Sequence, residues 1–282
     1  MTNHRKVALT SAILTLLIVL HFAFLTPNVK ADSNDKWAVV VGVEGGGATH
    51  LDNDAQDFAN VLQTVYGFPS NQTILLTNGQ ATKSAVTSAL QTVRDYEDNQ
   101  TIVAIFFSTH GDTDMFCLYD AWMTGSELQS ILAQYESPKM LVLINACKSG
   151  SILYISSVVQ GIVISACNAT ELTYDIENFQ NTVFVEYFVN QGIAQAKADS
   201  NSDGHVTVEE AFIYAEAKCN PPPGPLIIPR THPQIVDNYT GSMDLAQAVH
   251  APWFTSLTLT VLAAVIILAL YRKRTLTKVQ KD

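Results

Sequence analysis

Residues 101–112 read TIVAIFFSTHGD, and residues 140–151 read MLVLINACKSGS. Each stretch starts with a continuous apolar run, which is typical of a strand covered on both faces of a parallel sheet. Each run ends in a polar segment, which contains His110 in the first stretch and Cys147 in the second. Parallel strands joined by a crossover helix end at the same edge of their sheet. We therefore expect the two side chains to approach one another there.

Strands and helices alternate on both sides of this pair. Val-rich apolar runs predict strands, and apolar residues at helical spacing predict helices. The predicted strands cover residues 37–43, 73–76, 101–108, 140–145 and 161–165, and the predicted helices cover residues 52–66, 82–96, 124–135, 181–197 and 208–218. Thr124 and Glu127 have the spacing of a capping box. The alternation predicts an α/β fold, in which helices cover both faces of a mostly parallel sheet.

The residue types at the two strand ends suit nucleophilic catalysis. A Cys147 thiolate can attack a carbonyl carbon, while the His110 imidazole accepts a proton and later protonates the leaving amine. The backbone N–H groups of Gly111 and Cys147 are the expected oxyanion hole. The remaining cysteines have no such partners, and we interpret them as core or disulfide residues: Cys117, Cys167 and Cys219.

The surroundings of the two residues resemble the caspase, legumain and metacaspase group of cysteine peptidases. The histidine lies in Thr-His-Gly-Asp and precedes the cysteine by 37 residues, and residues 146–151 (ACKSGS) look most like the legumain family. The resemblance covers residues 36–245, including DNDA, GIVISACNATELTYD and THPQIVDNYTG. It implies a caspase-like three-layer α/β/α sandwich, a His110/Cys147 dyad and a cysteine endopeptidase that acts on peptides or proteins.

The resemblance also suggests where the substrate side chain binds. In these families the residue two positions before the nucleophile often helps to form the S1 pocket. That residue is the neutral Asn145 here, whereas metacaspase-like members that favour Arg or Lys have an acid, so the resemblance does not carry a preference for basic residues over to this chain. Four further residues follow or end strands at the same edge, and we expect them to line the pocket: His50, Asp54, Ser165 and Glu171.

A second motif predicts a calcium site. Residues 199–210 read DSNSDGHVTVEE and match the EF-hand loop at every specified position, with Gly204 at the sharp turn. The expected ligands are Asp199, Asn201, Asp203, His205 through its carbonyl, Thr207 and Glu210. A single loop favours a structural Ca²⁺ over a paired sensor. We expect no organic cofactor, because the glycines at 45–47 lack the spacing of a nucleotide-binding loop.

Both ends of the chain predict membrane targeting. Residues 1–31 have the basic start, apolar run and small cleavage-site residues of a signal peptide, although the long run leaves retention as an anchor open. Residues 253–271 carry no charge and are long enough to be a transmembrane helix. The basic tail at 272–282 is then cytoplasmic. Residues 32–245 are the expected peptidase domain, extracellular or lumenal, and residues 246–252 are its stalk.

The charge distribution excludes one class of partner. The chain carries −10; residues 1–31 contribute +3 and residues 272–282 contribute +4, which leaves −17 on the rest. Such a body repels nucleic acid, so the expected partners are a protein substrate and a lipid bilayer. Two alternatives stay open: a transamidase that resembles the catalytic subunit of the GPI transamidase, and a non-catalytic calcium-binding surface receptor on a peptidase-like fold.

Overall fold

A computed structural model describes residues 36–45, 49–220 and 230–246. The predicted signal peptide at 1–31, the predicted transmembrane helix at 253–271 and the tail at 272–282 lie outside the described residues, as does the stalk beyond residue 246. Among the helices that are described, none combines the length and the apolar character needed to cross a membrane.

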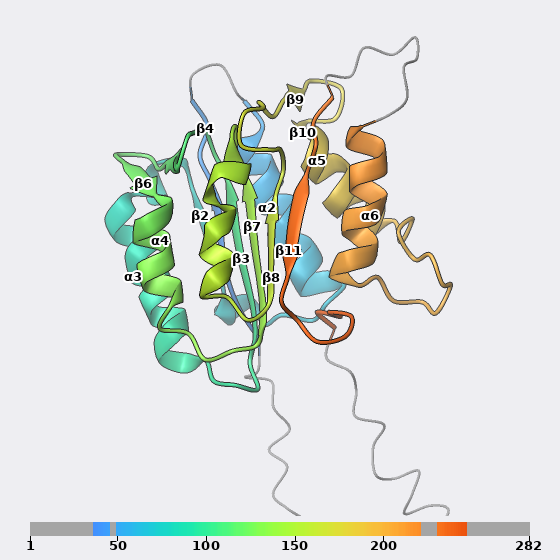
Figure 1. The fold of residues 1–282 in the computed structure, drawn as a ribbon, viewed down its shortest axis with the longest axis horizontal. Coiled ribbons are helices and arrows are strands. Elements are labelled where there is room, and N and C mark those ends of the chain that lie inside the picture. Colours follow the sequence, from blue (N-terminus) through green and yellow to red (C-terminus); the bar gives the residue numbers. More distant parts are fainter. Residues whose placement is uncertain (1–35, 46–48, 221–229, 247–282) are drawn as a thin grey trace, which may run out of the picture. The chain divides into compact units, whose positions relative to one another are not determined.

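A six-stranded sheet lies between two layers of helices (Figure 1). Its strand order is β11–β8–β7–β3–β1–β2. The strands are β1 (Lys36–Gly42), β2 (Thr73–Thr77), β3 (Ile102–Ser108), β7 (Lys139–Asn145), β8 (Ile162–Ser165) and β11 (Gln234–Asp237). All neighbours pair in parallel except β11, which is antiparallel to β8. The predicted mostly parallel sheet is confirmed. The edge strand β11 was not predicted, because its four residues are exposed or half-buried and lack a buried-strand pattern.

Two hydrophobic cores flank the sheet and fix the three layers (Figure 1). Alternate strand residues enter opposite cores, as the pleat requires: Phe106 packs on the first side and Phe107 on the second. The first core receives α2 (Leu51–Thr64), α5 (Val183–Val185), the π-helix η4 (Glu186–Ala194) and α6 (Val208–Cys219). The second receives α3 (Lys83–Tyr96), α4 (Gly125–Leu132) and the 3-10 helix η3 (Ser149–Ser157). The short 3-10 helices are η1 (Ser70–Gln72) and η2 (Asn78–Gln80).

Two local patterns differ from the prediction. The expected helix at 181–197 starts later, because Asn181 and Thr182 form the short strand β10 (Asn181–Thr182), which pairs with β9 (Asp175–Ile176). The extended backbone is held there because Thr182 N–H donates to the buried Asp54 carboxylate, at 3.0 Å. A small antiparallel sheet also follows β3, formed by β4 (Gly111–Asp112), β5 (Met115–Cys117) and β6 (Trp122–Thr124). The capping box of α4 is present as predicted.

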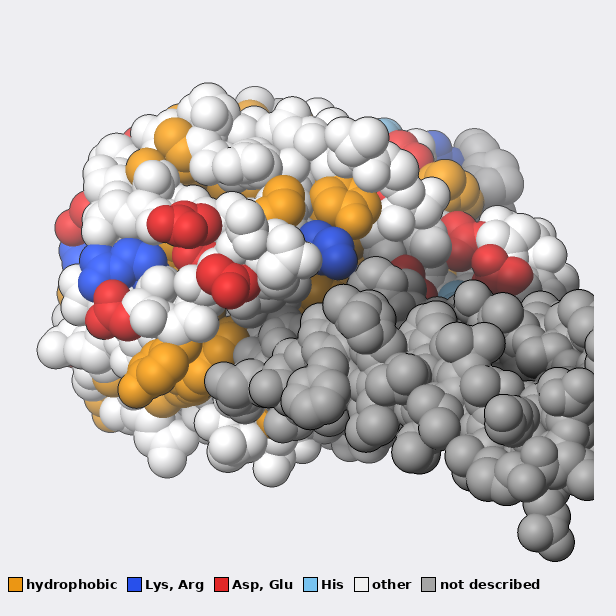
Figure 2. Space-filling view, turned by 90° about the horizontal axis from the view of Figure 1, so that it is seen from below, with side chains coloured by type: hydrophobic (Ala, Val, Ile, Leu, Met, Phe, Trp, Pro, Cys, Tyr) orange, Lys and Arg blue, Asp and Glu red, His pale blue; other side chains and the backbone are white. Residues whose placement is uncertain are grey.

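One face of the molecule shows how the charges are distributed. On the described surface in Figure 2, acidic and basic side chains are interspersed with polar ones, and hydrophobic side chains form separate small patches. No continuous basic stripe crosses the described part of this face. This distribution is in keeping with the acidic balance of the chain.

Candidate active site

The ends of β3 and β7 bring His110 and Cys147 to the same edge of the sheet. Ser108 and Asn145 are paired in the parallel register, and each of the two candidate residues follows two positions later. Thr109 N–H donates to the Asn145 carbonyl at 3.1 Å, so the two chains stay together beyond the last ladder pair. Both His110 and Cys147 are partly exposed, which leaves them accessible to a ligand.

Gly111 makes the closest contact between the two loops. A Cβ atom at this position would lie 2.4 Å from the Cys147 carbonyl oxygen and 2.8 Å from the Ala146 Cβ. Only glycine allows this approach, because no side chain can be accommodated at such distances. In the described residues no acceptor binds the Cys147 N–H, so this N–H is free to donate to an oxyanion.

The His110 ring is oriented by a backbone carbonyl. Its Nε2 atom forms a short hydrogen bond with the Gly45 carbonyl. A carbonyl only accepts, so Nε2 carries a proton in this contact, and Nδ1 is the ring atom left to exchange a proton with the thiol. The described contacts include no direct hydrogen bond between His110 and the Cys147 sulfur. Catalytic hydrogen bonds often shorten only when substrate binds.

A segment after β8 borders the nucleophile. The Cys147 Sγ lies 3.9 Å from the Thr173 carbonyl oxygen and 4.0 Å from its Oγ1. Lys148 N–H donates to the Glu171 carbonyl at 2.7 Å, which fixes the segment against the nucleophile loop. Thr173 was not among the predicted site residues. It lies in irregular structure, and neither periodicity nor a motif marks such a residue.

Two of the predicted pocket residues, Asp54 and Asn145, meet in a buried polar cluster. Asn145 Nδ2 donates to Asp54 Oδ2 at 3.0 Å, and Ser108 Oγ donates to the same oxygen at 2.7 Å. Thr182 Oγ1 also donates to that oxygen, at 2.9 Å, while Thr182 N–H and Asn181 Nδ2 donate to Oδ1 at 3.0 and 3.1 Å. Both carboxylate oxygens therefore already have donors from the protein itself.

Burial dominates the acid–base behaviour of this cluster. Asp54 is fully buried, and desolvation raises its pKa from 3.8 to about 7, although the hydrogen bonds from Ser108, Thr182 and Asn181 act in the opposite direction. The Asn145 Oδ1 atom is also buried and has no hydrogen-bond partner. A buried acceptor without a hydrogen-bond donor costs free energy.

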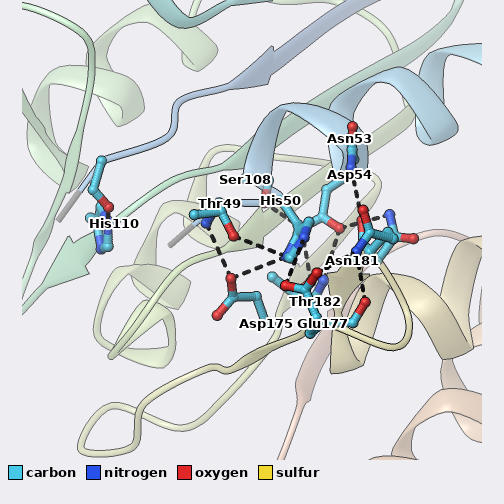
Figure 3. Close-up of polar contacts among 12 residues, drawn as sticks. Thr49, His50, Asn53, Asp54, Ser108, His110, Asp175, Glu177, Asn181 and Thr182 are labelled. Carbon is cyan, nitrogen blue, oxygen red and sulfur yellow. Dashed lines mark hydrogen bonds and ion pairs between the residues drawn. The ribbon is translucent and has the colours of Figure 1, made fainter. Parts of the chain in front are cut away.

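The other three predicted pocket residues bind to partners of their own. His50 Nδ1 lies 3.3 Å from Asp175 Oδ2, in a group that Figure 3 shows apart from His110. Ser165 Oγ donates to the Cys167 carbonyl at 3.0 Å. Glu171 accepts from His232 N–H at 2.9 Å and pairs with the ring Nδ1 at 2.5 Å. Burial acts to raise the pKa of Glu171, but the bonds from His232 outweigh it and the pKa is lowered.

The four cysteines are free thiols. The buried Cys167 thiol lies 3.3 Å from the Ala146 carbonyl, and burial raises its pKa. Burial also raises the pKa of Cys219 to about 12 and that of Cys117. These three thiols are therefore protonated at neutral pH and poor nucleophiles.

The predicted calcium loop closes on itself. Gly204 has a φ of +86°, which provides the sharp turn, and its N–H donates to Asp199 Oδ2 at 3.0 Å. Glu210 accepts from Ser200 Oγ at 2.7 Å and from Thr207 N–H at 3.1 Å, and the bonds from Ser200 and Thr207 lower its pKa. Asn201 and Asp203 also accept from loop N–H groups.

The loop offers carboxylate and amide oxygens, which suit Ca²⁺. These oxygens accept hydrogen bonds from N–H and O–H groups of the loop itself. The His205 ring contacts a residue outside the loop, since its Nδ1 atom lies 3.4 Å from Asp244 Oδ2. Within the described ranges, no three His, Cys, Asp or Glu side chains converge closely enough to hold a metal ion. Calcium binding stays a prediction.

A histidine and a cysteine at adjoining strand ends of an α/β/α sandwich define the arrangement of a caspase-type cysteine peptidase. The chain belongs to the caspase domain family (peptidase C14), whose family model matches residues 35–262. No curated protein gives a significant match to the sequence.

Two solved structures show the same fold. A protein from Geobacter sulfurreducens is 16% identical, with a TM-score of 0.55, and the match covers 73% of this chain and 94% of that one. Caspase-1 from Spodoptera frugiperda is 13% identical, also with a TM-score of 0.55, and the match covers 77% of this chain and 92% of that one.

Proposed function

We propose that the protein is a cysteine endopeptidase in which Cys147 is the nucleophile and His110 is the general base and acid. The observation that carries this proposal is the contact between the two loops: Gly111 packs directly on the Cys147 peptide group, while a backbone carbonyl orients the His110 ring. A non-catalytic binding protein does not require a free thiol, an oriented imidazole and an unpartnered N–H at the same edge of the sheet.

The reaction follows from these positions. His110 Nδ1 takes the thiol proton, and the Cys147 thiolate attacks the scissile carbonyl carbon. The resulting oxyanion accepts hydrogen bonds from the N–H groups of Cys147 and Gly111. His110 then protonates the leaving amine, and an acyl-enzyme forms on the sulfur. Water, activated by the same ring, hydrolyses the thioester and restores the free thiol.

The buried cluster favours an uncharged P1 side chain. The two oxygens of Asp54 already accept five hydrogen bonds, so a lysine or arginine would have to displace one of these donors. Asp54 and Asn145 are also fully buried, so neither side chain presents an accessible negative charge to a basic P1 residue. A peptide library with every residue at P1 should therefore show stronger cleavage after uncharged residues than after Arg or Lys.

The catalytic role is tested with the full chain in detergent. Incubation with a diverse peptide library and Ca²⁺ should give cleavage products, and Cys147→Ala and His110→Ala should each reduce their formation by at least about 10³-fold. Cys219→Ala serves as the matched control, because this buried thiol lies at the end of α6 and is remote in sequence from both loops. Equal cleavage by the wild type and Cys147→Ala, or none by either, contradicts the proposal.

The same assay separates hydrolysis from transfer. Both reactions pass through the thioester and differ only in what attacks it. An amine such as glycinamide is added to the cleavage reaction, and the acyl products are analysed by mass. A hydrolase yields mainly free carboxylates, whereas amide products in excess would support the transamidase alternative.

We also propose that the 199–210 loop binds one structural Ca²⁺. The sequence match and the sharp turn at Gly204 support it. A chelator should lower the melting temperature, and calorimetric titration should give one site. Asp199→Asn should weaken that site, because it removes a charged ligand, while Asp95→Asn outside the loop should not. An unchanged melting temperature in chelator, with no heat of binding, counts against the site.

We further propose that the peptidase domain lies on the outer side of a membrane, anchored by residues 253–271. The uncharged run and the basic tail after it support this placement. The full chain should stay in the membrane fraction after carbonate extraction, and a chain ending at residue 250 should be released. Release of both forms would contradict the C-terminal anchor.

A further inference from the structure

The segment from Glu171 to Asp175 borders the nucleophile but has little packing of its own. Residues 171–174 belong to no helix or strand, and Leu172 and Tyr174 are 48% and 37% exposed. Thr173 nevertheless lies 3.9 Å from the Cys147 sulfur through its carbonyl oxygen. Because apolar burial does not hold this segment, polar contacts at its ends must fix its position.

Both ends of the segment carry such contacts. At one end, the Glu171 carbonyl accepts from Lys148 N–H at 2.7 Å. At the other end, Asp175 Oδ2 accepts from Thr49 N–H at 3.1 Å and lies 3.3 Å from His50 Nδ1 (Figure 3). The Asp175 carboxylate therefore ties the segment to the residues that precede α2.

The fold holds His50, the partner of Asp175, firmly in place. Its side chain is only 8% exposed, and its carbonyl accepts from Asp54 N–H at the start of α2, at 3.1 Å. The helix itself packs tightly on β1, since a Cβ on Gly42 would lie 2.5 Å from the Leu51 carbonyl.

Both nitrogens of the His50 ring face acidic side chains of the same chain. Its Nε2 atom lies 3.7 Å from Glu177 Oε2, while Nδ1 faces Asp175. Both ring nitrogens thus face carboxylates of the same loop. The expectation that His50 lines the S1 pocket stays a prediction.

We propose that His50 and Asp175 form a clasp that holds residues 171–175 beside Cys147 in the position that a substrate backbone requires. The inference rests on the proposed peptidase function and adds a positioning residue to it. An extended peptide binds through main-chain hydrogen bonds to an exposed backbone edge, and the free energy of that binding depends on the edge being fixed beforehand. His50 acts on substrate through the segment and does not touch it.

The kinetic test uses the full chain and peptides that extend several residues before the cleavage site. His50→Ala and Asp175→Ala should each lower kcat/KM at least about tenfold, mainly through KM, since small misplacements near a reacting centre are costly. The double variant should be no worse than either single one, because both remove the same contact. His50→Gln should restore part of the loss, because its amide can donate to Asp175.

Two controls separate the clasp from other roles of His50. The rate at which iodoacetamide alkylates Cys147 should stay within roughly twofold in the clasp variants, since the small reagent does not need the segment. Asp95→Asn, at an exposed ion pair, should leave kcat/KM unchanged. Losses that add in the double variant would mean that His50 binds substrate directly, and would overturn the clasp.

Hydrogen exchange tests the clasp without requiring activity. The backbone amides of residues 172–176 should exchange faster in His50→Ala and in Asp175→Ala than in the wild type or in Asp95→Asn. Unchanged exchange in both clasp variants overturns the inference, whatever the kinetics. Faster exchange in a protein that cleaves no peptide supports the clasp and contradicts the proposed function, so the two failures are distinguishable.

Discussion

Asp54 is the single residue whose chemistry the fold changes most. In the sequence it is one of several acids in the first turn of a predicted helix, and only its place near a strand edge suggested a pocket role. In the structure it is fully buried and accepts hydrogen bonds from four side chains and a backbone N–H. No periodicity in the sequence could show that all these donors converge on one carboxylate.

The raised pKa of Asp54 makes its contribution to stability depend on pH. The folded protein keeps this proton up to about pH 7, whereas the unfolded chain releases it near the ordinary value of 3.8. The folded state thus binds more protons between these values, so this contribution falls as the pH rises through that window. The slope is on the order of 1 kcal/mol per pH unit.

Urea unfolding of the wild type and Asp54→Asn at pH 5 and pH 7.5 measures this effect. The variant keeps the shape of the side chain but cannot titrate, so it is the reference for the difference. The free energy of unfolding of the wild type, relative to the variant, should be larger at pH 5 than at pH 7.5. An equal difference at both pH values would show that Asp54 does not titrate in this range.

The positions of the two catalytic candidates, by contrast, could be predicted from the sequence. His110 and Cys147 follow long apolar runs, and the parallel register alone carries them to neighbouring positions. Thr173 has no such signal, because its place beside the sulfur depends on contacts of Glu171 and Asp175 with residues far away in the sequence. Sequence patterns locate residues at strand ends well and residues in irregular segments poorly.

At the scale of elements, the approach of β4 to the loop after β7 is the contact on which the dyad depends. Replacing Gly111 by alanine places a Cβ atom 2.4 Å from a backbone oxygen, so one of the two loops must move. We expect kcat/KM to fall on the order of 100-fold, with a loss of stability of about 1–3 kcal/mol.

Gly79→Ala is the matched control for this substitution. Its Cβ would meet only two tyrosine ring carbons, at ordinary contact distances of 3.8 and 4.0 Å. Peptide cleavage and urea unfolding are measured for both variants. Full activity in Gly111→Ala would show that the loops tolerate separation and that the packing has no catalytic role.

The boundaries of elements were predicted less well than their existence. The helix start at Thr124 agrees with its capping box, since local side-chain bonds define it. The start near residue 181 does not, because the acceptor that holds Thr182 extended is Asp54, 128 residues away. A capping bond between residues close in sequence can be predicted from the sequence. A hydrogen bond from a backbone N–H to a residue far away in the chain cannot.

At the scale of the whole molecule, the pattern of apolar and polar residues predicts the layered fold, and the amino-acid composition predicts an acidic surface. The alternation of buried strands and amphipathic helices sufficed to predict a mostly parallel sheet with helices on both faces. The 3-10 helix η3 and the small sheet β4–β6 were not predicted, because both are short and are stabilised by contacts with the sheet edge.

The negative charge of the body has a measurable consequence for stability. Residues 32–271 carry −17, since residues 1–31 contribute +3 and residues 272–282 contribute +4 to the total of −10. Repulsion among these charges destabilises the folded state and is screened by salt. The melting temperature should therefore rise between 50 and 500 mM KCl in the presence of chelator. A fall over this range would mean that attractive ion pairs outweigh the repulsion.

The antiparallel edge strand β11 also sets the order in which the molecule can be completed. Its residues 234–237 pair with residues 162–165, about seventy positions earlier in the chain. During synthesis, five strands emerge from the ribosome while the edge of β8 still lacks its neighbour. His232, the partner of Glu171, is translated just before β11. A nascent chain therefore completes this edge of the sheet and the contact between Glu171 and His232 only when most of the protein has been made.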